Sequence, residues 1–308
     1  RPPRRDAGRG LIAMRVALVV PGRFHAFDLA RGLAQHGHDV TVLTNYPAWA
    51  AARFNLGGAA VRSCRWHGAA TRLLARAPRA LGRERADAWM SRGFGRWAAR
   101  TLAGGRWDLI HCWSGVSEEL LASSSVRADC RWLMRGSSHI AVQDRLLREE
   151  EQRTGTRLDR PSAWMIARER REYALADRIV VLSTFARRSF EAEGVPADRL
   201  VTVPLGVEID AFRAPADAVA RRMQRIHAGA PLRVLYAGAL TLRKGLWDLA
   251  TALERLDDVP LDVRLIGGES PEAREGVAEE EMRVGVRGVE PRRFLVVCER
   301  VGEPVEAR

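Results

Sequence analysis

The chain has 308 residues, enough for two domains that each bury a hydrophobic core. Apolar residues make up 46% of it and charged residues 29%, a composition that excludes disordered and membrane-embedded classes and favours a soluble globular protein. The net charge of +12 alone does not predict nucleic-acid binding, because arginine replaces lysine almost everywhere and no zinc-finger or aromatic RNA-binding signature occurs.

The start of the chain and the cysteines give the expected compartment. Residues 1–13 are basic but contain no apolar signal core, so no export signal is predicted. We expect a disordered leader, or residues upstream of a natural start at Met14. The four cysteines are scattered and suggest no disulfide framework, which favours the reducing cytoplasm. Cys64 and His67 have metal-ligand spacing but lack a second pair of ligands, so no metal site is predicted.

The first predicted unit is a βαβ fold. Met14–Pro21 is typical of a buried parallel strand, Asp28–Gln35 has helical spacing, and Asp39–Thr44 is the next strand. The loop after the first strand lacks the G-x-G-x-x-G fingerprint of dinucleotide-binding proteins. A nicotinamide cofactor is therefore not predicted.

A strongly basic segment follows, with eleven arginines between Arg62 and Arg106 against two acids, Glu84 and Asp87. Five apolar residues would line one face of a helix here: Ala86, Trp89, Met90, Phe94 and Trp97. A core-packing helix with a solvated basic face is the favoured interpretation. The alternative is a helix that contacts an anionic membrane surface, where basic residues and tryptophans act together.

Two strands then end in polar loops. Trp107–Cys112 precedes a loop and a helix from Ser117, and the short strand Arg131–Met134 runs into Arg135–His139. His139 thus stands where active-site groups of doubly wound sheets are found, although a lone histidine is more often structural. A serine hydrolase is not predicted, because no G-x-S-x-G elbow is present.

The middle of the chain continues the alternation of helices and strands. The expected elements are a charged helix at Ala163–Leu175, a strand at Arg178–Leu182, a helix at Thr184–Glu193, a strand at Leu200–Pro204, a linker at Leu205–Pro215 and a connecting helix at Pro215–His227.

A second βαβ unit begins at Leu232, and it carries the clearest candidate site. Its strand ends at Gly238, a short loop holds Arg243 and Lys244, a helix opens at Gly245, and Leu261–Gly267 is the next strand. Lys244 is the only lysine of the chain. Ligands of such sheets lie beyond the carboxyl ends of the strands, and helix N-termini favour anions, so the loop predicts a phosphate site.

Several of these stretches, in this order, resemble the retaining glycosyltransferases called family 4, or group 1. They are HAFDLARGLAQHGHDVTVLT, WDLIHCWSG, RGSSHI, REYALADRIVVLSTFARRSFEAEGVP, RLVTVPLGVEIDAF and LRVLYAGALTLRKG, and they extend from about Met14 to Gly268. The resemblance implies an α/β protein of GT-B type with two Rossmann-like domains. Such enzymes transfer a sugar from a nucleotide-sugar to an acceptor hydroxyl with retention of configuration, and they need no bound metal or other cofactor.

The resemblance also implies roles for particular residues. Arg243 and Lys244 would hold the donor diphosphate and stabilise its charge as it departs, with Gly22 and Gly238 also on the donor side. His139 matches the family histidine that faces the transferring sugar, so it is the third expected catalytic residue. His25 and Ser138 are expected on the side of the acceptor, a glycan or a lipid-linked one.

The sequence departs from the family pattern in three ways. Ala239 stands near the place where relatives carry an arginine, and Gly22 stands alone where many have two glycines. After Gly268 the family's glutamate-rich donor motif is missing, and Glu272 and Glu280 share only its spacing. We therefore expect an incomplete C-terminal domain and an impaired activity.

The expected organisation is a leader at 1–13, an acceptor domain at 14–208, a linker and connecting helix at 209–230, and a partial donor domain at 231–308. The competing hypothesis is a non-catalytic module that binds an anionic membrane through the arginine-rich segment, located at the inner membrane face. Nucleic-acid binding ranks last, since it rests on net charge alone.

Overall fold

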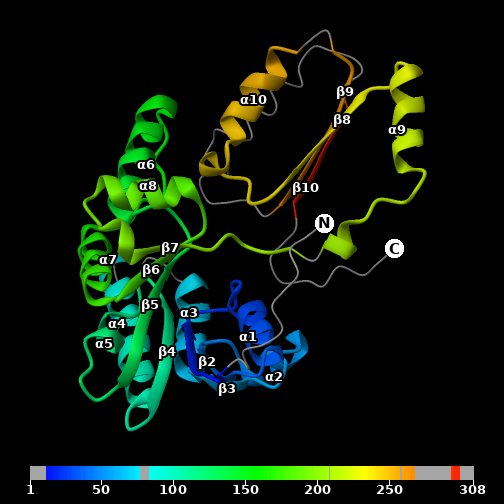
Figure 1. The fold of residues 1–308 in the computed structure, drawn as a ribbon. Coiled ribbons are helices and arrows are strands. Elements are labelled where there is room, and N and C mark those ends of the chain that lie inside the picture. Colours follow the sequence, from blue (N-terminus) through cyan, green and yellow to red (C-terminus); the bar gives the residue numbers. More distant parts are fainter. Residues whose placement is uncertain (1–11, 77–82, 208, 257–258, 268–292, 299–308) are drawn as a thin grey trace. The chain divides into compact units, whose positions relative to one another are not determined.

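The computed structural model describes residues 12–76, 83–207, 209–256, 259–267 and 293–298 (Figure 1). The chain forms two compact units, one of residues 1–144 and 161–206 and the other of residues 145–160 and 207–308. The sequence places residues 145–160 in the acceptor domain, whereas their contacts group them with the second unit.

The first unit is built on a parallel sheet of seven strands in the order β3-β2-β1-β4-β5-β6-β7. Its strands are β1 (Arg15–Val20), β2 (Asp39–Thr44), β3 (Ala60–Ser63), β4 (Arg106–Trp113), β5 (Arg127–Arg135), β6 (Arg178–Val181) and β7 (Leu200–Thr202). Its helices are α1 (Ala26–Gln35), α2 (Ala48–Ala51), α3 (Arg65–Arg76), α4 (Arg83–Leu102), α5 (Glu118–Leu121), the start of α6 (Ile140–Thr154), α7 (Ala163–Leu175) and α8 (Thr184–Ala192), with short 3-10 turns η1 (Ala52–Phe54) and η2 (Ala197–Arg199).

Helices cover both faces of this sheet, because side chains of the central strands alternate between two cores. Ala17 and Val19 of β1 pack in a core with α4, α5, α7 and α8, while Val16, Leu18 and Val20 pack with α1 and α2. Both faces of β1 are therefore buried, as its continuous apolar run predicts.

The sequence locates most of these elements, with three differences. Strand β5 begins four residues earlier than expected, at Arg127, because its polar residues still pair with β4. Strand β3 and helices α2, α3 and α6 were not predicted. On α4, Phe94 is buried as expected, but Trp89 is 54% exposed and does not share its face.

The second unit has a parallel sheet in the order β10-β9-β8, formed by β8 (Leu232–Ala237), β9 (Leu261–Gly267) and β10 (Arg293–Cys298). Its other elements are α9 (Ala218–His227), α10 (Leu246–Glu254) and the turns η3 (Ile209–Phe212) and η4 (Leu242–Lys244). Leu246 and Leu253 of α10 pack on Leu261, Val263 and Leu265 of β9. The segment after α6 joins this unit through Leu147 and Leu158, which contact Leu242.

The expectations for the leader and the tail lie outside the described residues, since these exclude 1–11, 268–292 and 299–308. Glu272 and Glu280 are among the excluded residues. Among the described residues, the apolar residues Leu235 on β8 and Ile266 on β9 are 64% and 36% exposed, so part of the second sheet is open to solvent.

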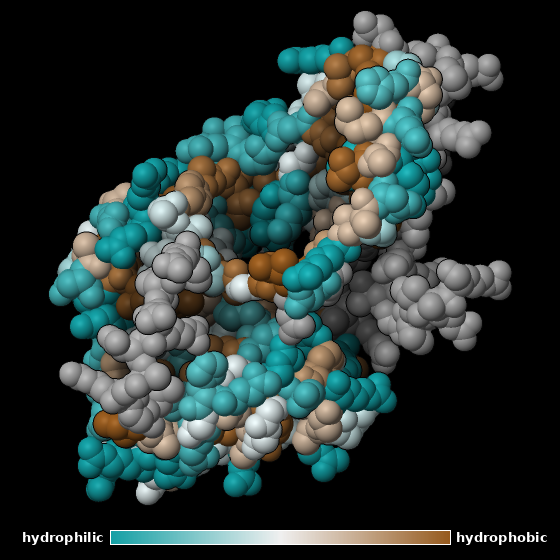
Figure 2. Space-filling view, turned by 45° about the vertical axis from the view of Figure 1, so that its right-hand side comes forward, coloured by the Kyte–Doolittle hydropathy of each residue, from teal (hydrophilic) through white to brown (hydrophobic). Residues whose placement is uncertain are grey.

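The surface is mixed in character. On the face that Figure 2 shows, hydrophilic residues predominate and apolar residues form separate patches between them. Among the helices that the structure describes, none combines the length and apolar composition needed to cross a lipid bilayer.

Candidate functional site

The loops that follow β1, β4 and β5 emerge at one edge of the first sheet. These three strands are parallel neighbours, so their carboxyl ends lie side by side (Figure 1). This is the edge at which doubly wound sheets bind ligands. Four predicted residues follow these strands: Gly22 and His25 after β1, and Ser138 and His139 after β5.

The loop after β1 is held by its backbone. Gly22 has φ +116°, a conformation that other residues rarely adopt, and its carbonyl oxygen accepts a 2.6 Å hydrogen bond from Thr44 Oγ1. His25 follows at the start of α1, with its ring centroid 5.2 Å from that of Trp113 at the end of β4. Partial burial lowers the pKa of His25, so its imidazole is neutral near pH 7 and free to accept or donate a hydrogen bond.

The loop after β4 is fixed by a charged residue of α7. One carboxylate, that of Glu172, accepts hydrogen bonds from the amides of Gly115 at 2.5 Å, Ser117 at 2.7 Å and Glu118 at 3.1 Å. The fully buried Arg168 donates from Nε to the Gly115 carbonyl at 2.9 Å. Burial raises the pKa of Glu172 to about 7, against the opposing effect of Arg168. The two side chains thus hold the loop rigidly.

Arg168 is itself neutralised on the other side by α5. Its Nη2 lies 2.6 Å from the carboxylate of Glu119 and its Nη1 3.2 Å from that of Glu118. Because buried charges are tolerated only when they are paired and hydrogen-bonded, the cluster is a structural clamp between α7, α5 and the loop after β4.

The loop after β5 is organised by Arg135, the last residue of that strand. Its guanidinium contacts the Ser138 carbonyl at 3.2 Å, the Gln143 amide oxygen at 2.7 Å and the Glu169 carboxylate at 3.1 Å. Ser138 is buried, with its carbonyl taken by this contact. Arg135 therefore sets the path of the chain from β5 into α6.

His139 points into the helix layer. Its backbone amide donates to Ser189 Oγ at 2.8 Å, and its Nδ1 accepts from the Ala141 amide at 3.2 Å. Its ring packs against Tyr173 and Phe190, with centroids 5.0 Å away in each case. Burial lowers the pKa of His139 to about 4, in spite of Glu193 at 3.9 Å, so the imidazole is neutral at physiological pH.

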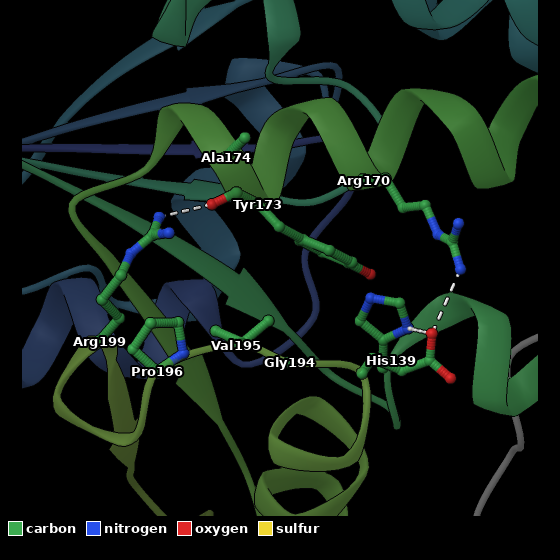
Figure 3. Close-up of a pocket in the computed structure, with 9 residues that line it drawn as sticks. His139, Arg170, Tyr173, Ala174, Gly194, Val195, Pro196 and Arg199 are labelled. Carbon is green, nitrogen blue, oxygen red and sulfur yellow. Dashed lines mark hydrogen bonds and ion pairs between the residues drawn. The ribbon is translucent and has the colours of Figure 1, made fainter.

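A pocket of about 350 Å³ lies beside this ring, between α7 and the segment that joins α8 to β7 (Figure 3). Arg170 pairs with Glu193 across it at 3.2 Å, and Arg199 donates to backbone carbonyls at its far end. No residue of the Gly22–His25 loop lines it. The observed contacts of His139 are those of a structural histidine, and its catalytic role stays a prediction.

The second unit presents Arg243 and Lys244 at the carboxyl end of β8. Both side chains are exposed, and within the described residues neither forms an ion pair. They end the turn η4, whose Leu242 is buried and anchors it to Leu147 and Leu158. The two cations are therefore carried by a fixed turn and remain available to an anion.

Three glycines shape this part of the second unit. Gly245 has φ +76° and connects η4 to α10, so it turns the chain from the cations directly into a helix N-terminus. A Cβ atom on Gly267, at the end of β9, would lie 1.7 Å from the carbonyl oxygen of Gly238. Only glycine fits at position 267. The predicted donor-side residue Gly238 is held by a hydrogen bond of 2.9 Å from its amide N–H to the Ile266 carbonyl.

The predicted residues thus fall into groups. Gly22 and His25 share one loop, Ser138 and His139 adjoin in another but are both buried, and Gly238, Arg243 and Lys244 belong to the second unit. The sequence did not reveal the clamp residues, because a charged helix such as α7 is ordinarily taken to be solvent-exposed.

Comparison with known structures identifies the fold. HepE of Anabaena, in complex with UDP and glucose, is similar with a TM-score of 0.52 and 13% identity over 92% of this chain and 69% of that one. The catalytic domain of starch synthase IV from Arabidopsis thaliana, bound to ADP and acarbose, gives a TM-score of 0.51 and 12% identity over 94% and 75%. No curated protein matches the sequence. The fold is that of GT-B glycosyltransferases, which confirms the predicted fold class.

The family follows from the sequence itself. The family model of Glycosyltransferase Family 4 matches residues 23–211, more than half of the chain. The chain belongs to Glycosyltransferase Family 4, and the resemblance inferred from the motifs is confirmed.

Proposed function

We propose that this glycosyltransferase takes a sugar from a nucleotide-sugar donor and transfers it to an acceptor hydroxyl with retention of anomeric configuration. The observation that carries the proposal is the exposed Arg243–Lys244 pair at the end of a parallel strand. Two unpaired cations next to the N-terminus of α10 suit a diphosphate, whose charge grows as the bond to the sugar breaks.

The named neighbours support this donor class. HepE holds UDP and glucose, and the starch synthase holds ADP, so nucleotides with a diphosphate bind to proteins of this fold. In this chain the diphosphate would be bound by Arg243 and Lys244, with Gly238 allowing close approach of the backbone. Lys244 supplies a compact charge and Arg243 a planar fork, which suits two phosphate groups.

On the acceptor side we assign the main role to His25. It is half-buried, uncharged near pH 7 and placed by the Gly22 loop at the carboxyl edge of the first sheet. A neutral imidazole in this position can hydrogen-bond a sugar hydroxyl. Ser138 and His139 would act by shaping the loop after β5, since both are buried.

Calorimetric titration with UDP, GDP and ADP tests the donor assignment. We expect one of them to bind the full chain and Lys244→Ala to weaken that binding roughly 10- to 100-fold, the usual value of a charge-assisted hydrogen bond. Arg222→Ala is the matched control, because Arg222 is an exposed cation on α9 of the same unit.

Equal losses of nucleotide affinity in Lys244→Ala and Arg222→Ala would show that binding depends only on the net charge of the protein. That result would refute the assignment. Retention is tested separately, by nuclear magnetic resonance of the anomeric proton in the glycosylated product. A product whose anomeric configuration differs from that of the donor sugar would exclude retention.

A second function, binding of an anionic membrane by the arginine-rich segment, is favoured by a separate observation, the exposed faces of α3 and α4. It does not exclude glycosyl transfer.

A further inference from the structure

We propose that the exposed ring of Phe24 is a stacking platform on which a sugar ring of the acceptor, a pyranose, lies. The inference rests on the proposed glycosyl transfer and deepens it, because it names the chemical class that the acceptor presents to this loop. Three features of one turn carry it: a strained backbone, an uncovered aromatic ring, and polar side chains fixed on either side.

Phe24 stands in a tight turn between β1 and α1. The Ala26 amide donates to the Arg23 carbonyl at 3.2 Å, which closes the turn around Phe24 and His25. Phe24 has φ +40°, whereas His25 has φ −83°. A positive φ at the first central position of a turn is normally supplied by glycine, because a Cβ atom there crowds the backbone. The turn thus holds a bulky residue in a conformation that costs stability.

A second residue with positive φ shows what Phe24 lacks. Among the residues that the structure describes, Phe24 and Asn55 are the only two other than glycine with a positive φ. Asn55 has φ +43°, and its Oδ1 accepts from the Gly57 amide at 3.4 Å, the local hydrogen bond that suits asparagine to this conformation. A phenylalanine side chain can form no such bond. The strain at Phe24 therefore points to a use of its side chain, since strained residues cluster at ligand sites.

The Phe24 side chain contributes little to the hydrophobic core. It is 61% exposed, whereas Phe27, three residues later on α1, is 1% exposed. Its ring lies beside Gly22, where an added Cβ atom would be 3.5 Å from the ring. Part of the ring thus rests on the backbone of its own loop, and the larger part faces solvent. Burial of this ring does not explain why the strain is kept.

The side chains on either side of Phe24 are held on other aromatic rings. The Arg23 guanidinium lies over the Phe54 ring, 4.4 Å from its centroid, and the His25 ring centroid is 5.2 Å from that of Trp113. Neither side chain covers Phe24. The result is an apolar surface one ring wide, flanked by a fixed cation and a fixed neutral imidazole.

A pyranose matches this surface. One of its faces presents C–H groups, which the negative face of an aromatic ring attracts, while its hydroxyls lie around the rim. Stacked on Phe24, such a sugar would place hydroxyls where Arg23 can donate to them and His25 can donate or accept. An acyl chain needs an apolar surface longer than one ring, and it would take water from both polar neighbours without giving them a partner. The turn therefore favours a sugar over a lipid chain.

Nuclear magnetic resonance of the full chain with ¹³C-labelled phenylalanine tests the proposal. The probes are the methyl glycosides of glucose, galactose and mannose, with hexanol as the apolar probe, and the Phe24 ring signal is the one that Phe24→Gly lacks. We expect at least one pyranoside to shift this signal and hexanol to leave it unchanged. By saturation-transfer titration, Phe24→Gly should bind that pyranoside at least about tenfold more weakly, and Phe24→Tyr should keep its affinity within about twofold.

Neither measurement needs a donor or turnover, so failure of this inference and failure of the proposed glycosyl transfer are separate results. Phe185→Ala is the matched control, because Phe185 on α8 is also 61% exposed, and it should leave pyranoside affinity unchanged. Since glycine relieves the strain at position 24, Phe24→Gly should lower the melting temperature less than Asn55→Gly does.

Three outcomes would each overturn the proposal. The first is a Phe24 signal that no pyranoside shifts, whether or not hexanol does. The second is equal pyranoside affinity in the wild type and Phe24→Gly, or equal losses in Phe24→Gly and Phe185→Ala. The third is a melting temperature that falls further in Phe24→Gly than in Asn55→Gly, which would show that the ring serves the fold.

Discussion

At the end of β5 the imidazole of His139 is enclosed by Tyr173 and Phe190, and its Nδ1 already accepts the amide hydrogen of Ala141. A proton on Nδ1 would break that hydrogen bond and place a charge between two aromatic rings. Burial removes water from the charged form and thereby lowers the pKa of His139 to about 4, against the opposing effect of Glu193.

His139 should therefore make the free energy of unfolding depend on pH. The folded state holds a neutral imidazole down to about pH 4, whereas the unfolded chain takes up a proton at about pH 6.5. Stability is thus lost as the pH falls between these values. His139→Asn keeps an acceptor for the Ala141 amide and should reduce that loss by about 1–2 kcal/mol between pH 7 and pH 5.

Urea unfolding at the two pH values measures this effect. His227→Asn is the control, because His227 is exposed in the last turn of α9. An identical pH dependence in wild type and His139→Asn would contradict the assigned neutral state.

At the scale of elements, α7 is the component that holds the carboxyl edge of the first sheet in place. Arg168 and Glu172 lie four residues apart, and both reach the loop after β4. Through Arg168, the same helix also binds the short α5. The geometry of the candidate acceptor side therefore depends on side chains that touch no substrate.

Replacing Glu172 by Gln should destabilise the fold by about 2–4 kcal/mol, because the amide oxygen cannot serve three N–H donors and Arg168 loses a buried counter-charge. Glu149→Gln, an exposed change on α6, should cost less than about 0.5 kcal/mol. Thermal unfolding of both variants provides the comparison. A melting temperature of Glu172→Gln equal to that of Glu149→Gln would show that the clamp is not needed for the fold.

The same helix shows where sequence reasoning succeeds and where it fails. The bounds of α7, Ala163–Leu175, are predicted from its spacing alone, as are β2 and β9. The burial of its charged side chains could not be predicted, because it depends on backbone amides about fifty residues away in the sequence. The Arg243–Lys244 turn could be found, since it follows a strand and precedes a helix. The inward position of the His139 side chain could not be predicted, since its direction depends on packing between α7 and α8.

At the scale of the whole molecule, the two units carry separate parts of the proposed chemistry. In our proposal the second unit provides exposed cations for a donor diphosphate, and the first provides the His25 loop for an acceptor.

The most direct test of the central claim is the release of nucleoside diphosphate from a panel of UDP-, GDP- and ADP-sugars, with water as the acceptor. We predict that the full chain cleaves at least one of these donors and that Lys244→Ala lowers the rate by at least about tenfold, because charge on the leaving diphosphate loses its partner. Arg222→Ala should keep the wild-type rate. Failure of the folded chain to cleave any donor, or equal rates in wild type and Lys244→Ala, would contradict the account.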